Sequence, residues 1–445
     1  MIDALKHPQY ARLFLAQVMA LLGTGLLTVA LGLLAFEIAG NSAGAVLGTA
    51  FAIKMIAYVG LAPVANAVTG KLPRKAVLIS ADLTRAAVAL FLPFIDSAWQ
   101  VYVLIFVLQA ASATFTPAFQ AIIPDILKNE KDYTKALSLS RLAYDLENLI
   151  SPALAGLLLI FVSYHWLFGG TVFGFIASAA LVSFAKIPTI TVSGKTRPFI
   201  ERLTRGIRIY LATPRLKGLL ALNMTAAAAG AFVIVNTVVI VISGYDKTQA
   251  DVAYALMAFG GGSMVTAILL PSLLDRVSDR TLMLSAGFTL SVLSTGHALY
   301  MLSSGLPAWW SFLCIWSASG VLYAGILTPS GRLLRISAHS DDRPSIFSAQ
   351  FALSHACWLL TYPIAGWAGQ AFGLSASMII LGVIGLMGSI TAFFIWPFTD
   401  SRELDHGHND LPPDHPHLQE YQTDGKTHRH SFVIDDEHRS WPTHG

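Results

Sequence analysis

Charged residues are scarce in this sequence, and cysteine is almost absent. Asp, Glu, Lys and Arg make up 12% of the 445 residues, whereas a soluble globular domain carries about 25%. The two cysteines, Cys314 and Cys357, lie in apolar runs, which argues against a disulfide framework and a Cys-x-x-Cys site. With 54% hydrophobic residues and a mean hydropathy of +0.61, the composition indicates a membrane protein.

Motifs for ATP use, catalysis and secretion are also missing. No Gly-x-x-x-x-Gly-Lys-Ser/Thr phosphate loop occurs, which argues against ATP as the energy source. No Ser/His/Asp, Cys/His or zinc-hydrolase helix motif occurs, so we expect no enzyme activity, no tightly bound cofactor and no nucleic-acid partner. The first apolar run, Leu13 to Ala39, is too long for a signal peptide and is interpreted as a membrane span.

Long apolar runs fill most of the chain. A transmembrane helix needs about 20 mostly apolar residues. Twelve stretches qualify, at residues 11–39, 43–69, 76–96, 99–123, 138–162, 165–187, 216–242, 249–274, 281–303, 307–330, 344–369 and 373–398. The sequence therefore predicts an all-α membrane protein with twelve transmembrane helices in two six-helix halves.

Basic residues are distributed unevenly among the connections. If the N-terminus is cytoplasmic, the external connections carry one of the 29 Lys and Arg residues, Lys247. Lys54 and Arg85 lie inside spans, and the others lie on the cytoplasmic side or in the tail. By the positive-inside rule we expect a multi-pass protein of the cell inner membrane with both termini in the cytoplasm.

A basic connection, residues 188–215, divides the chain into halves at residues 1–187 and 216–398. Its apolar residues recur at about four-residue spacing with arginines on the other side: Phe199, Leu203, Ile207 and Leu211 against Arg202, Arg205 and Arg208. This pattern predicts an amphipathic helix on the inner membrane face.

The two halves share a motif at matching places. One copy begins at Thr116 and the other at Thr328. Each starts with Thr-Pro at the end of a fourth span, crosses a charged loop into a fifth span and reaches an Ala-Gly pair just after a proline. This correspondence indicates an internal duplication.

Six plus six helices in parallel halves resemble the major facilitator superfamily of secondary transporters, over about residues 5–398. The family's loop between spans 2 and 3 is usually Gly-x-x-x-Asp-Arg-x-Gly-Arg-Arg, whereas here it reads "NAVTGKLPRKAV", with Gly70 at the Asp position. The resemblance implies a cytoplasmic gate whose first loop lacks its acidic brace. The gate residues kept are Lys71, Arg74 and Lys75 in that loop, and Asp275, Arg276 and Arg280 between spans 8 and 9.

Charged residues inside spans are candidates for transport and proton coupling, because a charge at membrane depth is costly. They are Glu37 on span 1, Lys54 on span 2, Asp82 and Arg85 on span 3, and Arg141, Asp145 and Glu147 on span 5. Asp82 and Arg85 share a helix face, where they can neutralise each other as a brace. A buried carboxylate can exchange a proton for cargo, so we expect proton antiport through Asp145, Glu147 or Glu37.

Two histidines also lie in spans, His297 on span 9 and His355 on span 11. Imidazole suits nickel, cobalt, zinc and copper, which makes both residues candidate cargo ligands. Packing groups held by hydrogen bonds are the other interpretation.

The composition reverses after Phe398. Residues 399–445 hold eight of the thirteen histidines, ten acids and four basic residues, and we expect a cytoplasmic tail that is largely disordered without metal. The candidate ligands for a divalent metal (nickel, cobalt or zinc) are His406, His408, Asp414, His415, His417, His428 and His430. The more apolar segment Phe432 to Pro442 is expected to dock on a partner or on the transporter's inner face.

Three functions are open. "FTPAFQAIIPDI" and "NLISPALAGLLL" resemble an exporter branch with siderophore, macrolide and metal-efflux members, and the His-rich end resembles the nickel-resistance branch. These resemblances imply a monomeric exporter of divalent metal, nickel or cobalt first. A proton-coupled exporter of a drug or siderophore-like molecule is the alternative, and a non-transporting metal sensor or scaffold is the third. For the tail, a solvating end, an interaction arm, an expression tag and a weak metal buffer are the alternatives.

Overall fold

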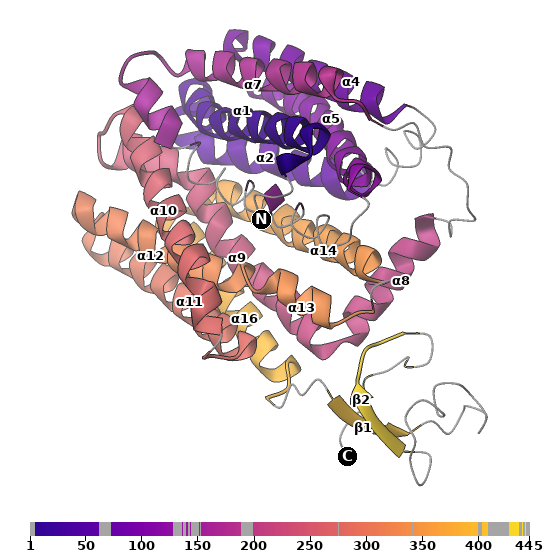
Figure 1. The fold of residues 1–445 in the computed structure, drawn as a ribbon. Coiled ribbons are helices and arrows are strands. Elements are labelled where there is room, and N and C mark those ends of the chain that lie inside the picture. Colours follow the sequence, from indigo (N-terminus) through magenta and orange to yellow (C-terminus); the bar gives the residue numbers. More distant parts are fainter. Residues whose placement is uncertain are drawn as a thin grey trace.

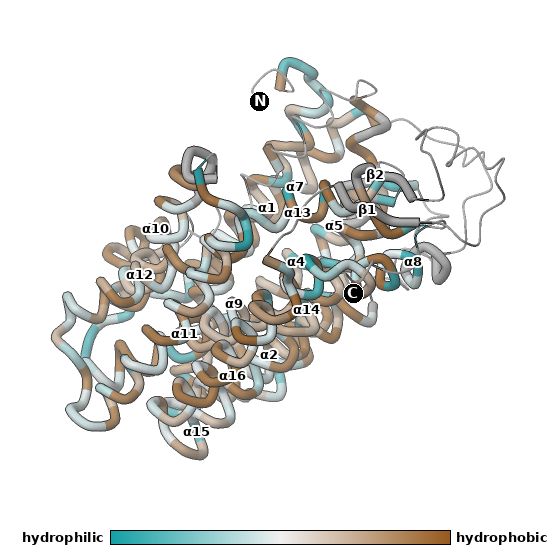
Figure 2. Tube along the Cα trace, turned by 90° about the horizontal axis from the view of Figure 1, so that it is seen from below, coloured by the Kyte–Doolittle hydropathy of each residue, from teal (hydrophilic) through white to brown (hydrophobic). Residues whose placement is uncertain are grey.

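Long helices make up nearly all of the regular structure in this computed structural model (Figure 1). The structure describes residues 5–61, 73–127, 136, 139–140, 143, 151, 153–187, 199–274, 276–339, 342–398, 403–407, 427–435, 438 and 441. Within these residues, nine helices are long and apolar enough to cross a membrane, and hydrophobic residues follow their length (Figure 2). Helices satisfy the backbone internally, as a bilayer core requires.

The first half holds α1 (Pro8–Ala39), α2 (Ala43–Ile56), α4 (Arg74–Phe91), α5 (Ala98–Ile126) and α7 (His165–Phe184). A short 3-10 turn, Gly40–Ser42, separates α1 from α2, and a π-helical turn, Ala57–Leu61, extends α2. Gly40 has a φ of +51°, a conformation that glycine adopts without steric cost. These helices correspond to predicted spans 1, 2, 3, 4 and 6. Of predicted span 5, residues 139, 140, 143, 151 and 153–162 are described, and the others lie outside the described residues.

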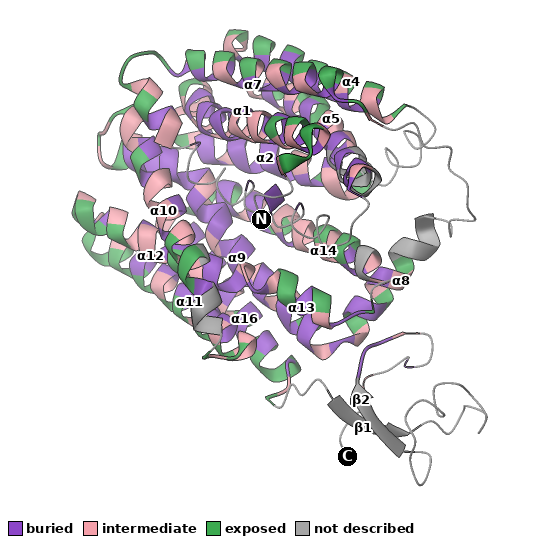
Figure 3. Ribbon diagram, in the orientation of Figure 1, coloured by how far each residue is buried: buried purple, intermediate pink, exposed green. Residues whose placement is uncertain are grey.

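The second half holds α9 (Pro214–Val239), α10 (Gln249–Leu274), α11 (Asp279–Ser304), α12 (Trp309–Leu327), α13 (Ser330–Ile336), α14 (Arg343–Pro363), α15 (Gly369–Phe372) and α16 (Leu374–Ile395). Two π-helical turns, Ile240–Gly244 and Ile364–Ala368, extend α9 and α14. Most residues of helix α9 are buried (Figure 3). Together the halves form an all-helical fold of about twelve helices, in agreement with the sequence.

Helix packing repeats between the halves. In the first half α1 packs on α7, and α4 packs on α5 and α7. In the second half α9 packs on α16, and α11 packs on α12 and α16. Spans 1, 3, 4 and 6 therefore meet as spans 7, 9, 10 and 12 do, which is the arrangement expected from the duplicated motif.

The linker forms the predicted helix, α8 (Phe199–Ala212), but its buried side differs from the expected one. Gly206 and Tyr210 are buried, whereas Leu211 is 42% exposed. The sequence places Arg205 on the solvent side, yet its Nε lies 2.6 Å from Oδ1 of Asp342. The helix packs on α14 and α9, because glycine at 206 permits a close backbone approach that a larger residue would prevent.

Two short parts of the tail have a described structure. Strand β1 (Glu403–Gly407) pairs antiparallel with β2 (Thr427–Ser431) beside the second half (Figure 1). The residues after β2 are buried, with Phe432 at 3% and Ile434 at 1% exposure. Backbone pairing and apolar burial offset the entropy of ordering these residues. For the rest of the tail, which lies outside the described residues, the expectation of a largely disordered segment stays a prediction.

Candidate functional site

Aromatic residues line the contact between the two halves, where α2 meets α14. Four rings on α14 share one helix face, because their spacing is i, i+4, i+7 and i+11. With two rings of α2 and its π-helical extension they form what we call the aromatic stripe: Phe351, His355, Trp358 and Tyr362 on α14, and Phe51 and Tyr58 opposite them. Such a stripe offers flat apolar surfaces at the interface that moves in alternating access.

Ring contacts join the two sides of the stripe. The centroid of Tyr58 lies 5.9 Å from that of Phe351 and 5.4 Å from that of His355. Further along, the centroid of Phe51 lies 5.1 Å from that of Tyr362. Helices α10 and α12 extend the stripe, since Phe259 contacts Tyr323 at 5.3 Å and Tyr323 contacts Trp358 at 6.5 Å.

Lys54 brings a positive charge to the stripe near the middle of predicted span 2. Its Nζ lies 5.8 Å from the Tyr58 ring centroid, a cation–π contact. The side chain is half-buried. Of the sequence-predicted charged residues that the structure describes, Lys54 is the one that lies on the contact between α2 and α14.

Glycines close the outer end of this interface, meaning the end that the predicted orientation places outside. A Cβ on Gly48 would lie 2.6 Å from the Tyr362 carbonyl oxygen and 3.1 Å from the Cα of Gly366. Two hydrogen bonds cross beside the glycines, from Trp367 Nε1 to Thr49 Oγ1 at 3.0 Å and from Gln370 Nε2 to Ser42 Oγ at 3.2 Å. The outer ends of the two spans are therefore in backbone contact in this conformation.

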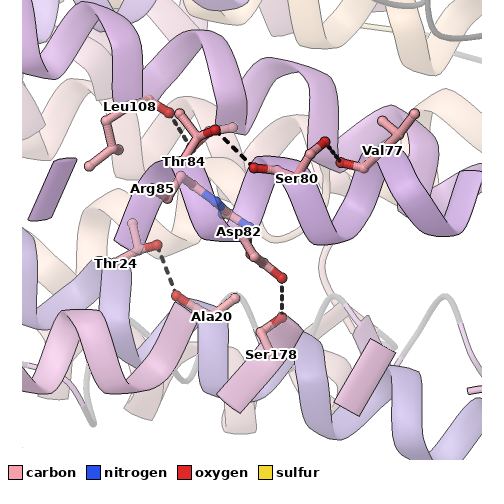
Figure 4. Close-up of polar contacts among 10 residues, drawn as sticks. Ala20, Thr24, Val77, Ser80, Asp82, Thr84, Arg85, Leu108 and Ser178 are labelled. Atoms are coloured by element: carbon pink, nitrogen blue, oxygen red, sulfur yellow. Dashed lines mark hydrogen bonds and ion pairs between the residues drawn. The ribbon is translucent and has the colours of Figure 1, made fainter. Parts of the chain in front are cut away.

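Asp82 and Arg85 form the ion pair that their spacing predicts (Figure 4). Ser178 of α7 donates a 2.7 Å hydrogen bond to Asp82, and the Arg85 guanidinium lies 4.4 Å from the Phe115 ring and 4.5 Å from the Phe175 ring. All these partners belong to α4, α5 and α7 of the first half. This geometry fits a brace within one half better than a proton carrier.

Glu37, the candidate proton carrier that the structure describes, lies at the outer end of α1. Tyr164 donates a 2.5 Å hydrogen bond to its Oε2. Burial, and then the neighbouring carboxylate, raise the pKa of the Tyr164 phenol above its usual range, so the phenol keeps its proton and donates it. The other candidates of span 5, Arg141, Asp145 and Glu147, lie outside the described residues.

The basic gate residues contact helix ends within their own half. Lys75 Nζ donates to the Ala185 carbonyl at the end of α7, at 3.1 Å. Arg280 donates to the carbonyls of Trp396 and Phe393 at the end of α16, at 2.8 and 3.0 Å. A cation stabilises a helix C-terminus, so Lys75 and Arg280 perform the same task in the two halves.

The positions of the remaining gate residues do not test the predicted gate. Arg74 is the first residue of α4, and Arg276 is exposed in the turn before α11. Lys71 and Asp275 lie outside the described residues. A closing contact across the halves through these loops stays a prediction.

The two span histidines occupy different surroundings. His297 is buried inside the second half, and its ring lies 5.9 Å from that of Trp316. His355 belongs to the aromatic stripe. Among the described residues no group of three or more His, Cys, Asp or Glu residues is placed to hold a metal ion.

The structure describes strand positions for three of the proposed metal ligands in the tail. His406 pairs with His428, and His430 pairs with Leu404, in the register of β1 and β2. His408, Asp414, His415 and His417 lie outside the described residues.

Sequence reasoning missed most of the aromatic stripe. It also missed the glycine contact between the outer ends of α2 and α14, which we call the outer crossing. The periodic rings of α14 were visible as a pattern of positions in the sequence. Nothing in the sequence indicated that this face meets α2, since that contact joins residues about 300 positions apart. The crossing glycines carried no local signal either.

The major facilitator superfamily model matches residues 13–328, which is more than half of the chain. The chain belongs to this superfamily of transporters, and it is a multi-pass membrane protein that is not an enzyme. Among solved structures, a point mutant of the nucleoside transporter NupG matches with a TM-score of 0.69 at 12% identity. That match covers 87% of this chain and all of the other, and at this identity it supports the fold alone.

Several curated relatives are similar over most of their length. The uncharacterized MFS-type transporter YfiS of Bacillus subtilis is 23% identical over 74% of this chain and 80% of its own. Macrolide efflux protein A of Streptococcus pyogenes is 23% identical over 64% and 71%. The multidrug efflux pump Tap of Mycobacterium tuberculosis is 25% identical over 85% and 91%. None of these three names refers to a metal.

Proposed function

We propose that this protein exports an apolar or aromatic organic molecule from the cytoplasm by proton antiport. The aromatic stripe between the halves carries this proposal. Rings stack on flat organic molecules and contribute binding without the ligand cluster that a bare cation needs. Similarity to macrolide and multidrug efflux proteins supports the same cargo class.

Alternating access supplies the mechanism. Rocking of the two halves exposes the stripe first to the inner side and then to the outer side. The outer crossing at Gly48 and Gly366 must open for release. Protons drive the cycle through an acid among Glu37, Asp145 and Glu147, in the inner membrane with both termini in the cytoplasm.

Cells lacking their own drug pumps test this proposal. The panel contains erythromycin, tetracycline, ethidium and rhodamine 6G together with nickel, cobalt and zinc salts. We expect resistance to at least one organic compound, reduced about tenfold by Tyr58→Ala or Trp358→Ala. Trp310→Ala is the matched control, because this tryptophan is 75% exposed on α12. Organic resistance that survives both stripe substitutions would contradict the proposal.

Metal export is the second candidate, with nickel or cobalt first. The eight histidines of residues 399–445, of which His406 and His428 are partners in the strand register, support metal binding by the tail. Metal resistance in the same panel, lost when the protein ends at Asp400 while organic resistance is absent, would favour this candidate over the first.

A further inference from the structure

The orientation of His355 within the stripe follows from one hydrogen bond. Its Nδ1 lies 2.6 Å from the carbonyl oxygen of Phe351, one helical turn earlier. A carbonyl oxygen can only accept, so Nδ1 must carry the hydrogen. In a neutral ring Nε2 then keeps a lone pair and acts as an acceptor.

The groups around His355 favour the neutral form of its ring. Phe351 packs against it at 3.9 Å between centroids, and Tyr58 lies at 5.4 Å on the opposite side of the stripe. The Lys54 ammonium lies beside Tyr58, and a second cation there would be repelled. His355 is half-buried, and among the described residues the one hydrogen bond of its ring is the Nδ1 contact to Phe351.

The geometry points to His355 as a specificity-determining residue, whose Nε2 accepts a hydrogen bond from a hydroxyl or amino group of the cargo. This inference rests on the proposed export of organic molecules. The α14 backbone fixes the tautomer, and the stripe holds the ring, so the acceptor is ready before cargo binds. A cargo without a donor leaves this acceptor unpaired in an apolar setting, which disfavours binding.

Nitrogen chemical shifts of the full-length protein test the orientation directly. Protein labelled with ¹⁵N-histidine is compared with His355→Phe, and the difference isolates the His355 signals. We expect a protonated Nδ1 and an unprotonated Nε2 at neutral pH. A protonated Nε2 would overturn the inference without affecting the proposed function.

Transport selectivity tests the role. The organic compound that gives the greatest resistance in the panel is compared with its O-methyl or N-methyl derivative. His355→Phe keeps an aromatic ring and should reduce the preference for the parent compound by about three- to tenfold, the effect of one hydrogen bond. His297→Phe is the matched control, because this histidine packs inside the second half.

Each outcome is decisive. Unchanged selectivity in His355→Phe, with export intact, overturns the inference alone. Absence of organic export in the wild-type protein overturns the proposed function and this inference with it. Loss of all export in His355→Phe is resolved by His355→Gln, which restores an acceptor and should recover the parent compound first.

A separate observation concerns the segment after β2. Phe432 and Ile434 pack in a cluster that includes Tyr210 of α8, Leu216 of α9 and Leu333 of α13. The segment therefore joins the linker helix to two elements of the second half.

Polar contacts hold the same segment in place. The Trp441 ring lies 5.2 Å from the guanidinium of Arg215, where α9 begins. Asp435 Oδ2 lies 3.3 Å from Nε2 of His339, and the Asp435 carboxylate also accepts the His438 backbone N–H at 2.7 Å. The first contact lies where α9 begins, and the contact with His339 lies just after α13.

We infer that residues 432–435, His438 and Trp441 are a clasp that fixes α8 to the second half, so that the linker helix moves with that half when the protein rocks. Amide hydrogen exchange in the full-length protein tests this. Ile434→Asp and Trp441→Ala should raise exchange of the α8 amides severalfold, while α11 stays unchanged.

Trp441→Phe is the matched control, because phenylalanine keeps a ring against Arg215 and should preserve slow exchange. Unchanged α8 exchange in Trp441→Ala and Ile434→Asp overturns the clasp. If Ile434→Asp does not fold, Trp441→Ala decides, since that side chain lies at the edge of the cluster.

Discussion

At the scale of single residues, Arg85 shows how this protein keeps a charge inside an apolar bundle. The carboxylate of Asp82 neutralises it, and Ser178 satisfies a second oxygen of that carboxylate. Two aromatic faces, Phe115 and Phe175, cover the guanidinium. The arrangement depends on all these groups together, because a buried charge without its partner is strongly destabilising.

Breaking this pair should destabilise the first half. Asp82→Ala leaves the Arg85 charge buried without its partner, and we expect a loss of about 3–5 kcal/mol. A lower melting temperature of the detergent-purified protein measures it. The double variant Asp82→Leu with Arg85→Met should recover most of that loss. Asp96→Asn, at an exposed site after α4, is the control.

If Asp82 instead carries the proton, the double variant folds but exports nothing. Retained export by the double variant would establish that the pair is a brace. This measurement therefore distinguishes a brace from a proton carrier, the two roles that the sequence allows for Asp82 and Arg85.

At the scale of helices, the outer crossing of α2 and α14 depends on missing side chains. The two spans come into backbone contact at Gly44, Gly48 and Gly366. Small residues permit such contact in membrane helices, where association relies on close packing. A larger residue at Gly48 or Gly366 would disrupt the contact, because the neighbouring atoms are backbone atoms and no flexible side chain can move aside.

Gly48→Val should hold the outer ends apart. Its side chain would meet the Tyr362 carbonyl and the Gly366 backbone, so the helices must separate. Spin labels at Asn41→Cys and Phe372→Cys, in a background without Cys314 and Cys357, should report a longer distance than in the unsubstituted protein.

Gly32→Val is the matched control for this prediction. Gly32 also lies in a membrane helix, but a Cβ there has no neighbour within 4 Å. Equal label distances in the Gly48→Val and Gly32→Val proteins would show that the crossing does not keep the outer side closed.

At the scale of the whole molecule, rocking requires the two halves to part at their outer ends. A short bifunctional thiol reagent joining Thr49→Cys to Trp367→Cys ties those ends, since the native side chains are 3.0 Å apart. We expect export to stop after cross-linking and to return when a cleavable linker is reduced.

A cross-link within one half provides the comparison. Thr266 of α10 donates a 3.0 Å hydrogen bond to the Val321 carbonyl of α12, and both helices belong to the second half. Joining Thr266→Cys to Val321→Cys should leave export intact. Export that continues with the outer ends tied would refute alternating access through this interface.

Sequence alone determined the features that depend on local pattern. Apolar runs located the membrane helices, basic residues predicted their orientation, and matching Thr-Pro motifs indicated an internal duplication. The three-residue spacing of Asp82 and Arg85 also sufficed to pair them, because that spacing places both on one helix face. The helices and the ion pair follow from residues close in sequence, whereas the orientation and the duplication follow from patterns along the whole chain.

Tertiary structure decided what lies between distant segments. In the folded protein Tyr58 contacts Phe351, and Gly44 and Gly48 contact Gly366 at the outer end. Phe432 and Ile434 of the tail pack against the second half. Tertiary structure also separated His297 from the stripe that holds His355. Such contacts depend on which helix faces meet, and the near-uniform hydrophobicity of a membrane helix does not specify that face.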